Sequence, residues 1–272
     1  MPELPEVETI KRGLDEGLRG VSILEIEVLH PGVLKNQSPE AFRLRLLGDS
    51  FIKVERRGKF LLLFLHSGQV ILIHLRMTGN LFLSDPDSPR QKHLHLLFRL
   101  DNGEDLRLVD QRKFGEVHLI FASQVPEYPP LKKLGVEPFD PSFSPENLFS
   151  ILKGSKRGIK QLLLDQTKIS GIGNIYADEA LFCAKIHPSR EANSLSFEEA
   201  RRLFSSIREV LNRSIQAQGR TFSNYLNARG EPGDYQPLVH DAKKEYCPYC
   251  GTPIEHRKLF GRGTFYCPKC QK

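Results

Sequence analysis

The chain has 272 residues, 39 basic and 33 acidic side chains, and ordinary proportions of hydrophobic (39%) and charged (26%) residues. This length is typical of two domains, each with a core of its own. The composition excludes a disordered or fibrous chain, and no apolar run approaches the roughly 18 residues of a membrane-spanning helix. The start of the chain, MPELPEVETI, has neither a basic nor an apolar leader region. We therefore expect a cytoplasmic protein without a secretory signal.

The excess of positive charge lies in the C-terminal half of the chain. Residues 1–150 hold 19 basic and 21 acidic side chains, residues 151–235 hold 13 and 9, and residues 241–272 hold 7 and 3. Such a distribution is typical of a face that binds a polyanion, although a solvated charged surface gives the same modest excess. Charge alone leaves both interpretations open.

The N-terminal half predicts one helix followed by strands. Between about residues 21 and 121 the pattern is one of short apolar runs separated by Gly, Asn and Asp, and the DNG at 101–103 predicts a hairpin. We therefore expect an antiparallel β-sandwich with an N-terminal helix, and we assign it residues 1–125. The predicted helix spans residues 2–18, where apolar side chains recur at helical spacing at Val7, Ile10, Leu14 and Leu18.

A proline-rich segment separates this region from the C-terminal half. The stretch 122–145 contains six prolines and no long hydrophobic period. We therefore place a linker at 126–144. Residues 145–240 follow as a helical domain that ends in a loop, and residues 241–272 follow as a cysteine-rich module.

Capping signals mark the helices of the helical domain. Ser144 followed by Pro145 predicts a helix start. Ser196 and Glu199 form a capping-box pattern before the last helix, and Gly219 predicts its end.

The strongest chemical signal is a C-x2-C-x16-C-x2-C pattern made by Cys247, Cys250, Cys267 and Cys270. Four thiolates at this spacing suit one tetrahedral Zn²⁺ and leave no position for water, so we expect a structural zinc. Disulfide pairing is the alternative, which a reducing compartment disfavours. Between the two pairs, FGRGTFY places Arg262 between glycines. This predicts either a hairpin tip that inserts a guanidinium into a groove or a plain exposed turn.

The N-terminus offers a nucleophile. Removal of Met1 would expose Pro2 as a secondary amine with a pKa near ~8. An amine that attacks C1′ of a sugar forms an iminium that acidifies the 2′ hydrogen, and Glu3 beside it could transfer the protons. The alternative is an ordinary start codon followed by a helix-initiating proline.

Three short motifs in the N-terminal half combine cations with apolar and aromatic side chains. An apolar side chain, a guanidinium and an aromatic ring are suited to filling the space left by a base extruded from DNA. Taken singly, however, Met and Phe are more often core residues. The motifs are RRGKF with Lys59, HLRMTGN with His74 and Met77, and DQRKFG with Arg112 and Phe114.

The glycine-rich segment KISGIGNIY is a weak signal for a nucleotide-binding loop. Its glycines, Gly171 and Gly173, permit close backbone approach. Asn174 at a predicted helix start can donate to a single phosphate.

Together these motifs resemble those of the formamidopyrimidine-DNA glycosylase family. The matching segments are PELPEVET at 2–9, RRGK at 56–59, HLRMTG at 74–79, DQRKFG at 110–115, GIGNIYADE at 171–179 and the terminal GRGTFYCPKCQK. They occur in order across nearly the whole chain. The resemblance implies an α+β multidomain fold, with an N-terminal β-sandwich, a helix-two-turn-helix domain with a lesion-covering loop, and a C-terminal four-cysteine zinc finger.

The function that the resemblance implies is base-excision repair of double-stranded DNA. Such an enzyme removes oxidised purines, chiefly 8-oxoguanine and formamidopyrimidines, and then cleaves the abasic site by β,δ-elimination. The expected partner is DNA that contains oxidised bases or abasic sites, and we expect a monomer.

The resemblance also implies roles for individual residues. Pro2 would be the Schiff-base nucleophile and Glu3 the general acid, with Glu6 as a support for the amine. Lys59 would assist β-elimination, and Arg262 would assist δ-elimination. Three side chains would fill the space left by the extruded base, namely Met77, Arg112 and Phe114. Four others would bind the DNA backbone, namely His74, His93, Lys156 and Asn174.

Two segments depart from the family pattern, and two rival functions stay open. Gly219 is followed by Arg220 where the lesion-covering loop usually has a second glycine. Residues 238–247 read LVHDAKKEYC where a stretch ending in GEPC is usual. The conformation of the loop and the docking of the finger are therefore open.

One rival is an endonuclease VIII-like glycosylase for oxidised pyrimidines, which Leu4 disfavours because that class usually begins PEGPE. The other is a non-catalytic zinc-finger DNA-binding protein, which would leave the motif at 2–9 unexplained.

Overall fold

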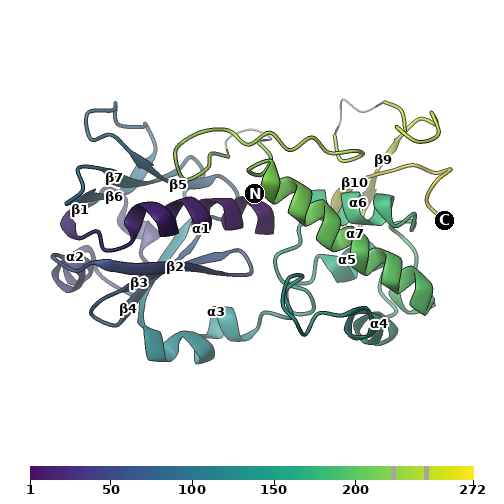
Figure 1. Cartoon of the computed structure of the whole chain (residues 1–272), viewed down its shortest axis with the longest axis horizontal. Coiled ribbons are helices and arrows are strands. Elements are labelled where there is room, and N and C mark those ends of the chain that lie inside the picture. Colours follow the sequence, from purple (N-terminus) through teal and green to yellow (C-terminus); the bar gives the residue numbers. More distant parts are fainter. Residues whose placement is uncertain (222–224, 242–244) are drawn as a thin grey trace. The chain divides into compact units, whose positions relative to one another are not determined.

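A computed structural model of the chain describes residues 1–221, 225–241 and 245–272 (Figure 1). Residues 222–224 of the predicted lesion-covering loop, and residues 242–244 of the atypical segment before the first cysteine pair, lie outside the described residues.

The chain divides into two compact units. The first comprises Met1–Lys132 and Ser214–Tyr235, and the second comprises Lys133–Arg213 and Gln236–Lys272. In the described part of the chain, no helix combines the length and hydrophobicity needed to cross a bilayer.

The first unit confirms the predicted antiparallel β-sandwich with an N-terminal helix. One sheet has the strand order β1-β6-β7-β5 and the other β2-β3-β4-β8, and neighbouring strands in both are antiparallel. The elements are α1 (Leu4–Leu18), β1 (Ile23–Val28), η1 (Pro31–Val33), α2 (Pro39–Leu46), β2 (Phe51–Arg57), β3 (Phe60–Leu65), β4 (Gln69–His74), β5 (Gly79–Ser84), β6 (Leu94–Leu100), β7 (Asp105–Asp110), β8 (Glu116–Phe121), η2 (Ala122–Glu127) and α3 (Pro129–Lys132).

Helix α1 lies between the edge strands of the two sheets (Figure 1). On the β2 side, Asp15 accepts a hydrogen bond from the backbone N–H of Val54 at 2.7 Å. On the β5 side, Gly17 packs so closely that a Cβ there would lie 2.4 Å from the Leu83 side chain. The apolar positions that predicted this helix are all buried, at Val7, Ile10, Leu14 and Leu18. The first residues of the chain are therefore fixed to the sandwich core.

The DNG hairpin predicted at 101–103 is confirmed. It joins the antiparallel strands β6 and β7. Gly103 has a φ of +81°, a value that glycine adopts without steric cost.

The proline-rich stretch contains two short helical elements, η2 and α3. Pro129 is the first residue of α3, a position where its missing N–H costs nothing. Leu131 of this helix is buried.

The second unit confirms the predicted helical region followed by a cysteine-bearing module. Its elements are α4 (Pro145–Lys153), α5 (Ile159–Leu163), α6 (Asn174–Cys183), η3 (Ala192–Ser194), the hairpin β9 (Glu255–Leu259) and β10 (Arg262–Tyr266), and the greater part of α7 (Phe197–Gln216).

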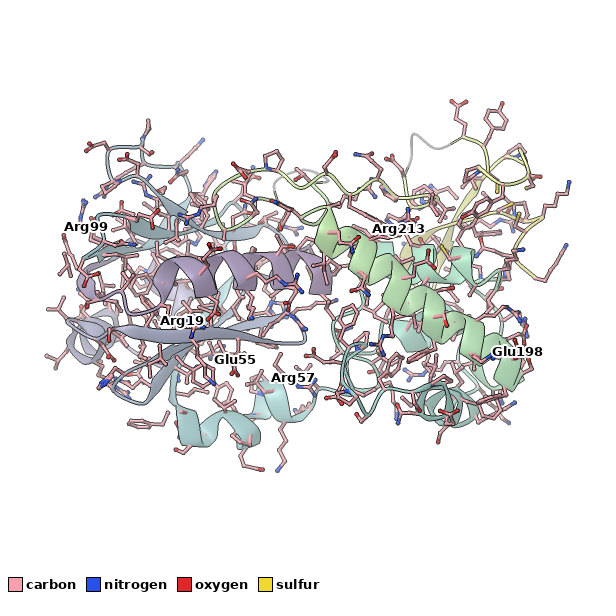
Figure 2. All side chains as sticks on the ribbon, in the orientation of Figure 1. Arg19, Glu55, Arg57, Arg99, Glu198 and Arg213 are labelled. Atoms are coloured by element: carbon pink, nitrogen blue, oxygen red, sulfur yellow. The ribbon has the colours of Figure 1, made fainter. Side chains whose placement is uncertain are left out.

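The predicted N-terminal helix caps are confirmed, whereas α7 ends at Gln216, three residues before the predicted stop at Gly219. The Ser144 hydroxyl accepts from the backbone N–H of Asn147 at 3.2 Å. Ser196 and Glu199 exchange the two reciprocal bonds of a capping box, at 3.2 and 2.9 Å. Helix α7 has Glu198 in its first turn and Arg213 in its last (Figure 2), an order of charges that the helix dipole favours.

The fold makes a stability prediction for α1. Ile10 is fully buried in the sandwich core, so Ile10→Ala should reduce the free energy of unfolding of this unit by about 2–5 kcal/mol. Urea unfolding followed by circular dichroism measures this. Glu16→Ala, at an exposed position of the same helix, is the control and should change the value by less than about 0.5 kcal/mol. Equal effects of the two substitutions would contradict the assigned packing of α1.

Candidate active site

The start of α1 is a buried acidic corner of the first unit. Pro2 is buried, and Glu3 and Glu6 are only 3% and 2% exposed. One oxygen of the Glu6 carboxylate accepts from the backbone N–H of Glu3 at 2.8 Å, and the other accepts from the backbone N–H of Arg220 at 3.0 Å. Glu6 therefore ties the residue that follows Pro2 to the beginning of the predicted lesion-covering loop.

The same corner explains why the loop needs only one glycine at its start. Gly219 has a φ of +83°, and a Cβ there would lie 3.1 Å from the Glu6 side chain. Arg220 contributes its backbone N–H, which any residue except proline supplies. Tyr225 also packs against Glu6. Its hydroxyl donates to the Glu6 carbonyl at 3.4 Å, and burial, assisted by the charge of Glu6, raises the pKa of Tyr225 well above its usual range.

Lys59 lies in a two-residue turn between β2 and β3. Gly58, the first turn residue, has a φ of +56°, as a type II′ hairpin turn requires. The Arg56 guanidinium donates both to the Gly58 carbonyl at 2.8 Å and to the Glu8 carboxylate of α1 at 2.9 Å. The turn that carries the buried Lys59 is thereby attached to the first turns of α1.

Glu8 is ionised in this arrangement. Burial acts to raise the pKa of Glu8, but hydrogen bonds from Arg56 and Arg12 outweigh burial and hold the pKa below its usual range. The charged pair of Glu8 and Arg56 was not identified from the sequence, because its partners lie 48 residues apart.

His74, at the end of β4, is a neutral hydrogen-bond donor. Its Nδ1 accepts from the backbone N–H of Arg76 at 2.9 Å, and its ring meets Phe60 edge-on with centroids 4.5 Å apart. Burial, together with the positive charges of Arg76 and Lys59, lowers the pKa of His74 to about 3. With Nδ1 acting as an acceptor, the proton lies on Nε2, where it can be donated to an anion.

Met77, Arg112 and Phe114 form one exposed cluster. The Arg112 guanidinium lies 4.8 Å from the centre of the Phe114 ring, and its Nη1 lies 3.0 Å from the Met77 sulfur. Met77 is 45% exposed and Phe114 50% exposed. The alternative interpretation of these two side chains as core residues is therefore wrong.

A buried carboxylate that the sequence analysis did not single out shapes the loop with Arg112 and Phe114. Asp110 is fully buried and accepts from the backbone N–H groups of Arg112 at 3.1 Å and Gly115 at 2.7 Å. It also accepts from the Thr78 hydroxyl, which joins this loop to the one that carries Met77. An Asp at the start of a polar turn is a known turn signal, so the motif DQRKFG did indicate that Asp110 shapes this loop.

Each of these two loops contains a non-glycine residue with left-handed backbone. Arg76 has a φ of 53° and Lys113 a φ of 59°. Arg76 is also fixed by a two-pronged ion pair with Glu116, at 2.9 Å. Such conformations persist only where the surroundings impose them, and they concentrate at functional sites.

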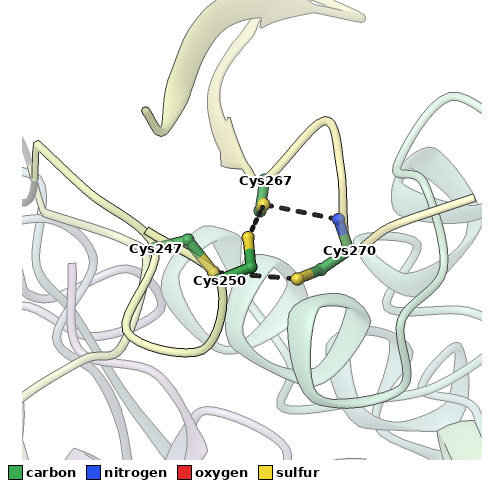
Figure 3. A group of neighbouring side chains, drawn as sticks. All are labelled: Cys247, Cys250, Cys267 and Cys270. Carbon is green, nitrogen blue, oxygen red and sulfur yellow. Dashed lines mark hydrogen bonds between the residues drawn. The ribbon is translucent and has the colours of Figure 1, made fainter. Parts of the chain in front are cut away.

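The four cysteines form a site that fits zinc (Figure 3). Their sulfur atoms all lie within 4.8 Å of one another, with Cys247 to Cys270 at 3.8 Å and Cys250 to Cys267 at 3.6 Å. Zn–S bonds of about 2.3 Å in a tetrahedron place sulfur atoms about 3.8 Å apart, whereas a disulfide requires about 2.05 Å. The alternative of disulfide pairing is therefore wrong, and one structural Zn²⁺ is the cofactor.

Arg262 is exposed and lies beside the tip of the hairpin made by β9 and β10. The two turn residues are Phe260 and Gly261, both with positive φ, and Arg262 pairs with Leu259 as the first residue of β10. The expectation that Arg262 itself forms the tip is therefore wrong by one residue. The turn is made by Phe260 and Gly261, and Arg262 follows it.

The remaining predicted DNA contacts lie in both units. His93 is half-buried in the first unit, and its carbonyl accepts from the backbone N–H of Asp110. Lys156 is exposed between α4 and α5 of the second unit. Asn174 begins α6, and its amide donates to the Gly263 carbonyl at 2.9 Å. These contacts place Asn174 next to the residue that follows Arg262.

Family models match almost the whole chain. Residues 1–117 match the formamidopyrimidine-DNA glycosylase N-terminal domain, and residues 134–225 match the H2TH domain of the same enzymes. Residues 244–272 match a zinc finger found in FPG and IleRS.

Individual proteins match over the full length. The formamidopyrimidine-DNA glycosylase of Symbiobacterium thermophilum is 47% identical, over 100% of this chain and 89% of that protein. The enzyme of the same name from Geobacillus kaustophilus is 42% identical over 100% of both chains. A crystal structure of Lactococcus lactis Fpg in complex with DNA containing N7-benzyl-Fapy-dG has a TM-score of 0.92 and 38% identity over 100% of both chains. A complex of the same protein with DNA containing an abasic site has a TM-score of 0.91, 37% identity and 99% coverage of both chains.

The sandwich, the helical domain and the four-cysteine finger together define a base-excision repair glycosylase that also cleaves abasic sites. The chain belongs to the formamidopyrimidine-DNA glycosylase family. The resemblance seen in the motifs is thereby confirmed, and the rival interpretation as a non-catalytic DNA-binding protein is wrong.

The titration of His74 can be tested through stability. The unfolded chain binds a proton on this residue below pH 6.5, whereas the folded chain does so only near pH 3. The contribution of His74 to the free energy of unfolding is therefore full above pH 6.5 and is lost as the pH falls toward 3, by up to about 1.4 kcal/mol per pH unit. His74→Gln should lose stability less steeply than the wild type between pH 6.5 and 5 in urea unfolding. His66→Gln, at an exposed position, should keep the wild-type slope, and a wild-type slope for His74→Gln as well would refute the assignment.

Proposed function

We propose that Pro2, after removal of Met1, is the nucleophile with which this enzyme excises oxidised purines from duplex DNA. The observation that carries this proposal is the buried corner at the start of α1, where Glu6 fixes the backbone of Glu3 directly after Pro2. A fixed first turn restricts where the amine can point, and near-attack geometry contributes much of the rate of such reactions.

The proposed reaction begins with excision of the base and continues with two eliminations. The Pro2 nitrogen forms a bond to C1′ as the bond between C1′ and the damaged base breaks, and Glu3 supplies the proton that the leaving base takes up. The protonated Pro2 nitrogen then gives its proton to O4′ as the bond between C1′ and O4′ breaks, which opens the sugar ring and leaves an iminium between the nitrogen and C1′. This iminium acidifies the 2′ hydrogen. Loss of that proton expels the 3′ phosphate in the β-elimination, and loss of the 4′ proton then expels the 5′ phosphate in the δ-elimination.

Lys59 and His74 are suited to a phosphate of the damaged strand. The positive charge of Lys59 helps to keep His74 neutral, so His74 offers a neutral Nε2–H donor while Lys59 supplies the positive charge. We assign Lys59 to the β-elimination and His74, with His93, to phosphate binding. Glu6 supports the amine through the backbone of Glu3.

The cluster of Met77, Arg112 and Phe114 is suited to the space vacated by an extruded base. Its guanidinium is already stacked on an aromatic ring and exposed, so little ordering is required on binding. We assign Arg112 to the opposite cytosine. In the second unit, Lys156 and Asn174 are assigned to the DNA backbone, and Arg262 to the δ-elimination.

The zinc finger supplies structure rather than chemistry in this proposal. Four thiolate ligands leave the metal no open position, and the metal fixes the two loops from which the hairpin with Arg262 extends.

The proposed domain boundaries remain those expected from the sequence, with 1–125 catalytic, 126–144 as the linker, 145–240 for the helical domain and 241–272 for the finger. We propose that the enzyme acts as a monomer in the cytoplasm, where bacterial DNA is exposed to oxidation.

Oxidised pyrimidines are a second candidate class of lesion. A structure of Lactococcus lactis Fpg, with a TM-score of 0.92 and 38% identity to this chain, is a complex with DNA containing an oxidised pyrimidine. Competition between duplexes with 8-oxoguanine and with thymine glycol decides between the classes. Faster excision of the purine is expected, and preference for thymine glycol would favour the endonuclease VIII-like alternative.

The nucleophile is tested by blocking and then freeing Pro2 in one protein. A cleavable N-terminal extension turns the Pro2 nitrogen into an amide without an available lone pair, so borohydride should trap no covalent adduct with 8-oxoguanine DNA. Removal of the extension to leave Pro2 first should restore trapping and strand cleavage. A blocked protein that is trapped as well as the freed one would show that another amine reacts.

The role of Lys59 has a matched control on the neighbouring strand. Lys59→Met should slow cleavage of abasic DNA about 100-fold, because the charge that assists the elimination is lost. Lys53→Met removes an exposed lysine of β2 that pairs with Glu55, and it should leave the rate within twofold. The measurement is single-turnover cleavage on a denaturing gel. Equal rates for both variants would remove Lys59 from the mechanism.

A further inference from the structure

The second unit contains a buried charged cluster that the mechanism above does not use. Lys160 of α5 and Asp178 of α6 have side chains that are 1% and 0% exposed, and their charged atoms lie 2.6 Å apart. His240 completes the cluster, because its Nδ1 lies 2.7 Å from the second Asp178 oxygen. A buried carboxylate between a lysine and a histidine is costly to desolvate, so it is stable only with its partners in place.

This cluster holds the strand that carries Arg262. The Lys160 ammonium donates to the Gly263 carbonyl at 3.0 Å and to the Thr264 hydroxyl at 2.8 Å. Asp178 accepts from the backbone N–H of Phe265 at 3.0 Å. Lys160 and Asp178, together with the Asn174 amide on the Gly263 carbonyl, therefore bind the three consecutive residues after Arg262.

The backbone of Arg262 is held indirectly as well. The Thr264 hydroxyl, which accepts from Lys160, donates to the Arg262 carbonyl at 3.1 Å. At the turn, the Phe260 ring lies against Gly158, where a Cβ would come within 2.3 Å of the ring. The hairpin therefore rests on α5 at its turn and on α6 along β10.

His240 belongs to the segment that departs from the family pattern, and α6 binds this segment. The backbone N–H groups of Leu238, Val239 and His240 donate to the Glu179 carboxylate at 2.6, 2.8 and 2.8 Å. The His240 ring also packs edge-on against Phe265 with centroids 4.9 Å apart. His240 Nδ1 and the backbone N–H of Phe265 thus share the same oxygen of Asp178, whereas Lys160 pairs with the other oxygen.

We propose that His240 and Asp178 are positioning residues for Arg262. The hydrogen bond from His240 Nδ1 orients the Asp178 carboxylate, and the carboxylate in turn fixes β10 through Phe265 and Lys160. This inference rests on the proposed role of Arg262 in δ-elimination. A shift of a catalytic group by about 1 Å can reduce a rate about 100-fold, so a loosened β10 affects the step that uses Arg262 first.

The test separates the two eliminations on abasic DNA under single-turnover conditions. His240→Phe keeps the ring contact with Phe265 and removes the Nδ1 donor. It should slow δ-elimination about tenfold and leave β-elimination within twofold of the wild type. His240→Asn places an amide nitrogen where Nδ1 lies in histidine, and it should restore δ-elimination to within about threefold.

A matched control uses the second histidine on the same aromatic ring. His256 stacks on Phe265 at 4.2 Å from within the hairpin and makes no contact with Asp178 among the described interactions. His256→Phe should therefore leave both rates unchanged. Failure of His240→Asn to restore the rate, or equal losses in both eliminations for His240→Phe, would overturn the inference.

Two further measurements keep the outcome decisive. Arg262→Ala tests the proposed function independently of His240. If Arg262→Ala leaves δ-elimination intact, the proposed role of Arg262 is wrong. If δ-elimination is lost in Arg262→Ala but not in His240→Phe, only the positioning role is refuted. Each variant must bind one zinc per chain. If His240→Phe does not, His240→Gln, whose amide extends one methylene beyond the Nδ1 position, takes its place in the comparison with His240→Asn.

Discussion

Buried carboxylates that accept backbone N–H groups are the interaction on which several functional loops of this enzyme depend. Glu6 holds the backbone of Glu3 and Arg220, and Asp110 holds that of Arg112 and Gly115. In the second unit, Glu179 holds the segment at 238–240 and Asp178 holds Phe265. Hydrogen bonds to an ionised acceptor are stronger than those between neutral groups, and a buried N–H without a partner is costly. These acids therefore give irregular loops one conformation each, which a hydrophobic contact alone would not define.

This arrangement resolves a conflict that any enzyme acting on DNA faces. Cations and aromatic side chains must be exposed to meet phosphates and bases, yet exposed side chains gain little from packing and lose entropy when they are ordered. Here the buried anchor lies within one to four residues of the exposed functional side chain. Asp110 is fully buried whereas Arg112 and Phe114 are exposed, and Gly263 and Thr264 are held whereas Arg262 is exposed. Preorganised side chains on a fixed backbone require less ordering when the substrate binds.

The sequence allowed prediction of those features that depend on neighbours along the chain. The period of Ile10 and Leu14, the caps at Ser144 and Ser196, and the spacing of the cysteines are local patterns, and the structure confirms them. The carboxylate anchors could not be predicted in the same way, because the partners of Asp178 at His240 and Phe265 lie 62 and 87 residues away. No periodicity or motif indicates which acid faces which backbone at such separations. The Pro2 amine was indicated by the residues themselves, whereas the elimination roles of Lys59 and Arg262 came from the family resemblance, and all three roles remain predictions for experiment.

The anchors also explain how this chain departs from its family pattern without losing the geometry of the site. At the start of the lesion-covering loop, the contact with Glu6 is made by the backbone N–H of Arg220, so a glycine is needed only at Gly219, where φ is positive. In the segment before the finger, Glu179 again binds backbone groups, so the identity of Leu238 and Val239 matters little to that contact. Sequence is free to vary where the main chain makes the contact. His240 is different because its side chain contacts Asp178. The backbone contacts of this segment tolerate substitutions, but at position 240 the residue type matters.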